Sequence, residues 1–142
     1  MGEFFLYFDG SSLDRGRRGG PGFSAGAAVL VGMDGILGKR SVFLRSADAH
    51  TAEFQGLLCG LHLALENKVD SVRIYGDSRI VIDQILGRKQ SQKQEMIRQR
   101  DEVLDLLKKF RTWELEWIPR RKNTLADQEA RRCLQGSGSI SF

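Results

Sequence analysis

FFLYFDG, residues 4–10, decides the fold of this 142-residue chain. Its five consecutive apolar residues are typical of a central β-strand that is buried on both faces, and the run stops abruptly at Asp9. A carboxylate at the end of a core strand is unusual. The carboxyl ends of parallel strands form the ligand-binding edge of open α/β sheets. Asp9 is therefore the first candidate functional residue.

The patterns that follow predict four more strands and four helices. Two strands joined by a tight turn at Asp34 and Gly35 complete three antiparallel strands near the N-terminus. Ser78 and Asn123 each precede a helical pattern and are the expected N-caps. The later alternation of strands and helices favours parallel pairing with the first strand, and hence an α/β fold. The further strands are expected at 23–31, 36–44, 72–75 and 113–117, and the helices at 51–66, 78–86, 95–110 and 123–134.

Length and composition indicate one globular domain, residues 1–134, followed by a flexible tail at 135–142. Hydrophobic residues make up 41% of the chain and charged residues 28%, which excludes a disordered chain of low hydrophobicity. No apolar run approaches the roughly 20 residues of a membrane span and no secretory leader precedes the first strand, so we expect a cytoplasmic protein. Both cysteines are expected to be free thiols. A net charge of +4 permits an anionic partner without requiring one.

Four carboxylates are placed to meet at one edge of the predicted sheet. Asp77 follows the strand at 72–75, so it lies beside Asp9 if the two strands are parallel neighbours. Glu53 lies one turn before the apolar stripe of the first helix, and Asp127 lies just past the first turn of the last helix. Each has a simpler explanation: a turn for Asp9, a helix cap for Asp77, and solvent-facing acids for the other two. Converging carboxylates require compensating positive charge, which Mg²⁺ supplies through oxygen ligands.

Four segments, taken in order, resemble type 1 ribonuclease H. They are YFDGSS (7–12), TAEFQGLLCGLHLAL (51–65), IYGDSRIVIDQI (74–85) and IPRRKNTLADQEA (118–130), and the resemblance spans residues 4–134. It implies a mixed five-stranded sheet of order 3-2-1-4-5, with strands 1–3 antiparallel and helices on its flanks. It also implies cleavage of the RNA strand of RNA–DNA hybrids, with two Mg²⁺ (or Mn²⁺) ions and with 5′-phosphate and 3′-hydroxyl products. The catalytic and metal-binding acids that it implies are Asp9, Glu53, Asp77 and Asp127.

The expected partner is an RNA–DNA hybrid, with no membrane, no obligate protein partner and no separate hybrid-binding domain. Small polar groups after the first strand suit detection of 2′-hydroxyls across a shallow minor groove. The chain departs from the family in three places. The residues DAHT (48–51) stand where many relatives have a Thr-Asn-Asn run. The histidine of the catalytic loop and the basic protrusion of some relatives are both missing. Arginines in the loop at 14–20 either contact phosphates in place of that protrusion or form a solvated loop. The residues expected to contact the hybrid are Gly10, Ser11, Ser12, Arg17, Arg18, His50, Thr51, Ser78 and Asn123.

Two other functions fit the same acids less well. A catalytically silent nucleic-acid-binding module with this fold would gain nothing from negative charge concentrated beside phosphates. A transposase or junction-resolvase relative would need additional elements for binding DNA, for which the chain has little room. The interpretation that follows is a metal-dependent hybrid endoribonuclease, in which Trp113 and Trp117 are core residues rather than base-stacking ones.

Overall fold

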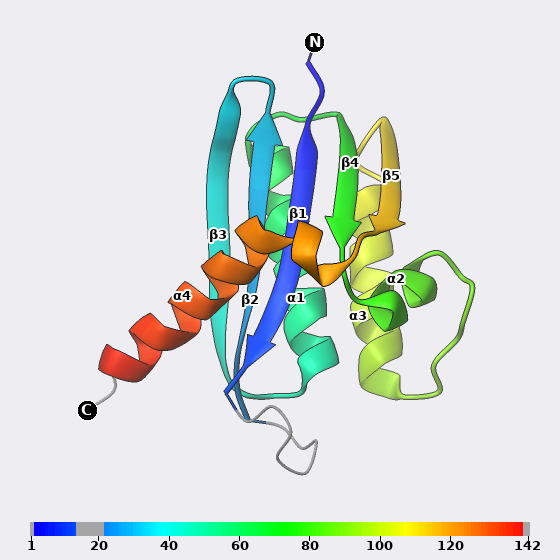
Figure 1. The fold of residues 1–142 in the computed structure, drawn as a ribbon. Helices are drawn as coiled ribbons and strands as arrows, with labels where there is room; N and C mark the ends of the chain where they lie inside the picture. The colour runs from blue at the N-terminus through cyan, green and yellow to red at the C-terminus, as the bar shows by residue number, and fades with distance from the viewer. Residues whose placement is uncertain (1, 14–21, 141–142) are drawn as a thin grey trace.

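The segment at residues 4–10 contributes to the middle strand of a five-stranded sheet in this computed structural model, which describes residues 2–13 and 22–140 (Figure 1). The strands are β1 (Phe5–Ser12), β2 (Gly22–Gly32), β3 (Gly35–Ala47), β4 (Ser71–Gly76) and β5 (Thr112–Trp117). The sheet order is β3-β2-β1-β4-β5. β1, β2 and β3 pair antiparallel, whereas β1 with β4 and β4 with β5 are parallel. The predicted mixed sheet and its strand order are therefore confirmed.

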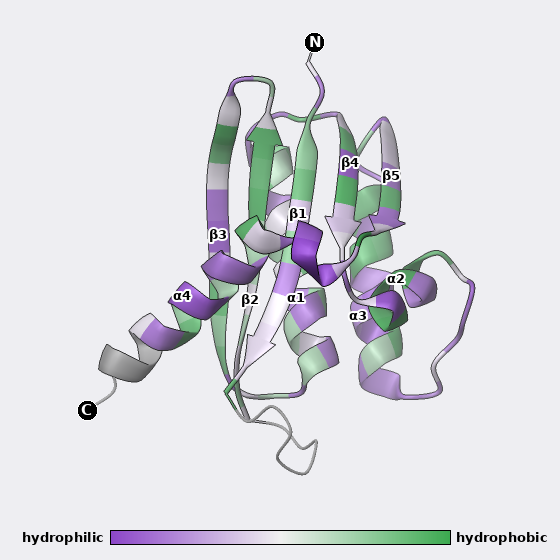
Figure 2. Cartoon of the chain, in the orientation of Figure 1, coloured by the Kyte–Doolittle hydropathy of each residue, from purple (hydrophilic) through white to green (hydrophobic). Residues whose placement is uncertain are grey.

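Helices cover both faces of the sheet. α1 (Ala49–Glu66), α2 (Arg79–Ile85) and α3 (Gln94–Leu107) lie on one face, and α4 (Thr124–Ile140) crosses the other after the short 3-10 helix η1 (Arg120–Lys122) (Figure 1). Figure 2 shows hydrophobic colour along β2 and hydrophilic colour along much of α4. Burial of a large apolar side chain contributes about 1.5–3 kcal/mol. The large core side chains that are at most 1% exposed include Leu6, Phe8, Phe54, Leu61 and Ile74.

β1 continues past the point at which the sequence predicts its end. The three residues after Asp9 stay paired with β2, up to the pair Ser12↔Ser24. The parallel pairing of β1 with β4 ends earlier, at Tyr7↔Tyr75. Asp9 thus lies inside a strand but beyond its last parallel pair, and the expectation of a strand end there is wrong. The backbone stays extended because β2 still supplies an antiparallel partner.

Two helices also end at least three residues away from their expected carboxyl ends. α3 ends at Leu107 rather than at residue 110. α4 continues to Ile140, whereas the sequence predicts an end near Leu134 and a flexible tail after it. The glycines and serines of this segment have low helix propensity, which is why the sequence favours the earlier end.

The expected side-chain environments hold in part. Trp113 is half-buried against the core, but Trp117 is 36% exposed at the end of β5, so the expected core position is wrong for Trp117. Both cysteines are free. Within residues 2–13 and 22–140, no helix is long and apolar enough to cross a membrane. The predicted phosphate contacts of Arg17 and Arg18 fall outside the described residues.

Candidate metal centre

Three of the four predicted acids meet at one edge of the sheet. Asp9 lies in β1, Asp77 follows β4 directly, and Glu53 lies on α1. One carboxylate oxygen from each of these residues lies within 4.8 Å of the other two. The parallel pairing of β1 and β4 brings Asp9 and Asp77 to the same edge, as the sequence predicts.

Glu53 reaches this edge because α1 packs very close to the sheet. A Cβ atom added to Gly56 would lie 2.5 Å from the backbone oxygen of Asp9. A Cβ atom added to Gly10 would lie 2.8 Å from the backbone nitrogen of Glu53. Only glycine permits backbones to approach this closely. Gly10 and Gly56 therefore let α1 lie directly against the backbone of β1.

Asp9 is the most enclosed member of the acid cluster, with 2% of its surface exposed. Its Oδ1 accepts a hydrogen bond of 2.8 Å from the backbone N–H of Gly10, but its Oδ2 is buried and has no hydrogen-bond partner. Burial, followed by the charge of Asp77, raises the pKa of Asp9 to about 8. A buried acceptor without a donor and a set of carboxylate oxygens both fit a hard divalent cation such as Mg²⁺.

Asn123 positions Asp77 from the start of α4. Its side-chain amide donates to Asp77 Oδ2 at 2.8 Å and to the backbone oxygen of Phe8 at 2.9 Å. Asn123 is fully buried. Asn123 lies at the predicted N-cap position of α4, because its backbone oxygen accepts from the N–H of Asp127 at 3.1 Å. Its side-chain Nδ2 ties the sheet edge to the acid, and its Oδ1 has no hydrogen-bond partner among the described residues, so the backbone alone makes the cap. Burial also leaves this side chain no surface for the predicted contact with nucleic acid.

Asp127 lies apart from the three clustered acids. Its carboxylate pairs with Arg131, one turn later on α4, with Nε at 3.2 Å from either oxygen. The charge of Asp127 is still near enough to contribute to the raised pKa of Asp9. The structure therefore brings three predicted acids together and places the fourth beside them, held by an arginine.

Known proteins share this arrangement of helices and strands. The family described as Reverse transcriptase-like matches residues 14–133. Ribonuclease HI of Halobacterium salinarum is 32% identical over 134 residues, which are 94% of this chain and 65% of that protein. The crystal structure of RNase H1 from this archaeon matches with a TM-score of 0.86 over 95% of this chain and 99% of that one. The chain belongs to the type 1 ribonuclease H family.

Two further structures share the ribonuclease H fold. The N-terminal RNase H domain of Rv2228c from Mycobacterium tuberculosis matches with a TM-score of 0.87 and 26% identity over 98% of each chain. LC11-RNase H1, crystallised in complex with an RNA/DNA hybrid, matches with a TM-score of 0.82 over 95% of this chain and 99% of that one. Its identity is 19%, so that match shows the fold alone. The chain spans 65% of the length of the Halobacterium ribonuclease HI.

His50 lies beside Glu53 in the first turn of α1. Its Nδ1 is 3.5 Å from Glu53 Oε1, and the two side chains form an ion pair when the imidazole is protonated. The contact with Glu53 raises the pKa of His50, and the charge of Asp48 adds to this effect. The sequence predicts a contact of His50 with the hybrid; the structure adds its contact with an acid of the cluster.

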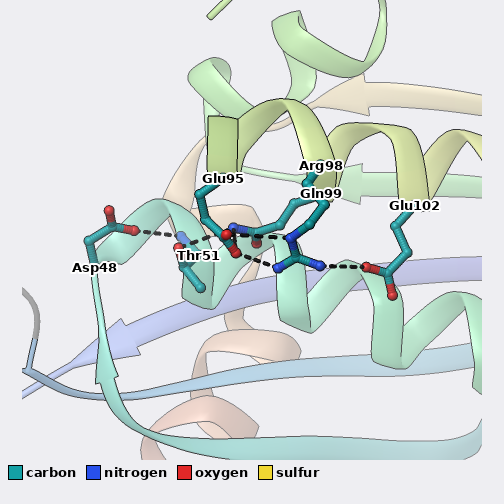
Figure 3. Close-up of polar contacts among 6 residues, drawn as sticks. All are labelled: Asp48, Thr51, Glu95, Arg98, Gln99 and Glu102. Carbon is teal, nitrogen blue, oxygen red and sulfur yellow. Dashed lines mark hydrogen bonds and ion pairs between the residues drawn. The ribbon is translucent and has the colours of Figure 1, made fainter. Parts of the chain in front are cut away.

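Thr51 joins α1 to α3 (Figure 3). Its backbone N–H donates to Oδ1 of Asp48, the N-cap of α1, at 2.8 Å. Its Oγ1 accepts from Nε2 of Gln99 at 3.3 Å, and the same nitrogen donates to Glu95 at 3.4 Å. Gln99 is 1% exposed, so this network lies between the two helices. The predicted contact of Thr51 with nucleic acid stays a prediction.

The serines of the predicted interface already have protein contacts. Ser78 Oγ accepts from the backbone N–H of Val81 at 3.3 Å, which confirms the predicted cap of α2. Ser12 Oγ donates to the backbone oxygen of Phe23 at 3.4 Å, and Ser11 is 7% exposed. Ser11 and Ser12 follow Asp9 on β1, and their contact with a hybrid stays a prediction.

Sequence reasoning missed two neighbours of Asp77. The indole Nε1 of Trp117 donates to the backbone oxygen of Asp77 at 3.1 Å, and the guanidinium of Arg79 lies over the same ring. The available signals were the position of Trp117 at the end of its strand and of Arg79 directly after the cap of α2. Neither signal shows by itself that the two side chains meet.

Proposed function

We propose that this chain is a metal-dependent endoribonuclease that hydrolyses the RNA strand of RNA–DNA hybrids. One observation carries the proposal: buried Asp9, with an unpartnered oxygen, clusters within 4.8 Å of Glu53 and Asp77 on a ribonuclease H fold. Concentrated negative charge repels phosphates, so a pure nucleic-acid-binding module gains nothing from this cluster. A metal-dependent nuclease requires it, because the acids hold cations against the substrate phosphate.

The three clustered acids are the proposed ligands of two Mg²⁺ or Mn²⁺ ions, and Asp127 is the proposed fourth catalytic acid. When bound, such ions activate water and stabilise the charge that develops on the phosphate oxygens. Asn123 holds Oδ2 of Asp77 in place, so the carboxylate is already oriented before a ligand arrives. The products would carry 5′-phosphate and 3′-hydroxyl ends, without a covalent enzyme intermediate.

The name of the 32% identical relative, ribonuclease HI, supports the RNA–DNA hybrid as substrate. We propose that Gly10, Ser11 and Ser12 detect 2′-hydroxyls from the strand that carries Asp9, with backbone and small polar groups. Residues 1–134 are proposed as the ribonuclease H domain, without an obligate protein partner and acting in the cytoplasm.

The test is incubation of an end-labelled RNA–DNA hybrid with the protein in Mg²⁺, in Mn²⁺ and in EDTA. We expect cleavage of the RNA strand in either metal and none in EDTA. Matched controls are duplex DNA of the same sequence, which should stay intact, and the Asp9→Asn variant, which should be inactive. Binding without cleavage in both metals would refute the enzyme and support the silent binding module. Cleavage of duplex DNA would support a transposase-like or resolvase-like activity instead.

A further inference from the structure

Trp117 and Arg79 form a stacked pair at the rim of the acid cluster. Trp117 ends β5 with 36% of its surface exposed, and its Nε1 is hydrogen-bonded to the backbone of Asp77. The guanidinium carbon of Arg79 lies 3.8 Å from the centroid of the indole ring. This distance is well within the range of a cation–π contact. The ring is tied to the segment that carries Asp77, so the arginine is held near the cluster in a defined place.

The hydrogen-bond donors of Arg79 have no partner within residues 2–13 and 22–140. Its side chain forms no ion pair and no hydrogen bond with any residue in the described part of the chain. Two other exposed arginines are paired: Arg73 with Glu114 at 4.0 Å, and Arg88 with an aspartate at 3.6 Å. Stacking on Trp117 satisfies the face of the guanidinium but leaves its N–H edge open.

Stacking also keeps Arg79 from neutralising the cluster. Arg79 is two residues from Asp77, and an ion pair between them would compete with a metal ion for the carboxylate. The structure holds the cation on the indole instead, so both charges remain available to ligands. The cations of η1, which begins three residues after Trp117, are exposed and add positive charge: Arg120, Arg121 and Lys122.

We infer that Arg79, held on Trp117, binds a backbone phosphate of the nucleic acid beside the acid cluster. A guanidinium presents N–H groups in a planar fork that matches phosphate oxygens, and a stacked guanidinium loses less freedom on binding than a mobile one. Such a contact positions the substrate and carries no sequence information. The inference rests on the proposed function and names one way in which the same site holds its substrate.

The test is the salt dependence of hybrid binding, measured by fluorescence anisotropy in the Asp9→Asn background, where cleavage is expected to be lost. Arg79→Ala should make the slope of log affinity against log salt shallower by roughly 0.7 to 0.9, the value for one phosphate contact. If the variant and its parent bind equally at 1 M salt, this difference in slope makes the variant bind about 5- to 8-fold more weakly at 0.1 M salt. Arg79→Lys should keep most of the slope.

Arg73→Ala is the matched control, because it removes the same charge from an exposed arginine of the neighbouring strand that already has a carboxylate partner. Its slope should equal that of the parent. An unchanged slope for Arg79→Ala would overturn the inference. An equal loss in both variants would overturn it as well, since the effect would then be one of net charge.

Trp117→Leu separates the ring from the charge. It leaves Arg79 in place but unstacked, so the slope should stay the same while binding weakens about 2- to 5-fold, the value of an exposed cation–π contact. Added to Arg79→Ala, the same change should weaken binding no further, because the ring acts through the arginine. A further loss in the double variant would show that the ring contacts the hybrid directly and would overturn the assignment.

Failure of the inference and failure of the proposed function give different results. If the wild-type protein does not cleave the hybrid in Mg²⁺ or Mn²⁺, the proposed function is wrong. If it cleaves the hybrid and Arg79→Ala leaves the salt slope unchanged, the phosphate contact alone is wrong.

Discussion

Replacement of Asp9 by Asn should make the metal-free protein more stable at neutral pH. Asn has the same shape and keeps the Oδ1 acceptor for the Gly10 N–H, but it is neutral in this 2% exposed site without taking up a proton. With its pKa raised from 3.8 to about 8 by burial and by Asp77, Asp9 is protonated in the folded chain and ionised in the unfolded chain between these values. The folded state then binds more protons, so wild-type stability falls as pH rises through this window.

The magnitude follows from the two pKa values of Asp9. Each pH unit above 3.8 costs the folded state about 1.4 kcal/mol until the pH approaches 8. The cost is therefore about 1 kcal/mol at pH 4.5 and at most about 4 kcal/mol at pH 7. The Asn variant lacks this pH-dependent cost. Its advantage in free energy of unfolding over the wild type should grow between these two pH values.

Urea unfolding of both proteins in EDTA at pH 4.5, 5.5 and 7 measures this difference. Comparison of the two proteins cancels the contributions of other titrating groups that the substitution leaves unchanged. Mg²⁺ should then stabilise the wild type more than the variant, because ligands stabilise the state that binds them. An advantage that is the same at all three pH values, or a variant less stable at pH 7, would refute the assignment of Asp9 as a buried, uncompensated acid.

Three more substitutions test how the cluster is built. Asn123→Ala removes the buried donor to Asp77, so the free energy of unfolding should fall by about 1–3 kcal/mol and kcat on a hybrid should fall as well. An unchanged kcat would show that other contacts hold Asp77. Gly56→Ala places a Cβ atom 2.5 Å from the backbone oxygen of Asp9. Urea unfolding should therefore show a free energy of unfolding lower by about 1–3 kcal/mol, and cleavage should slow. A stable and fully active variant would contradict the close packing of α1. Asp77→Asn should abolish cleavage and lower the pKa of Asp9, because Asp77 is the neighbouring charge that raises this pKa most. An NMR titration in which the pKa of Asp9 does not change would count against this electrostatic coupling.

Local sequence patterns were enough to predict the order and type of the elements. The apolar run before Asp9, the alternation at 113–117 and the helical stripe from residue 51 each carry the period of one kind of structure. The rule for crossovers between parallel strands then leaves few topologies, and the observed sheet is one of them. Boundaries were harder to predict, since the extra length of β1 depends on pairing with residues of β2 that are distant in the chain.

The sequence by itself determined which acids are available and which elements carry them, because both follow from residue type and local spacing. Only the tertiary structure decided that Asp9, Glu53 and Asp77 share one cluster while Asp127 pairs with an arginine. It also decided that Trp117 is exposed, although the alternating pattern of its strand predicts a buried side chain. Distances and burial depend on how segments that are distant in the chain pack together. The periodicity of a strand shows which face of the sheet a residue occupies, but not whether a helix covers that face at the end of the strand.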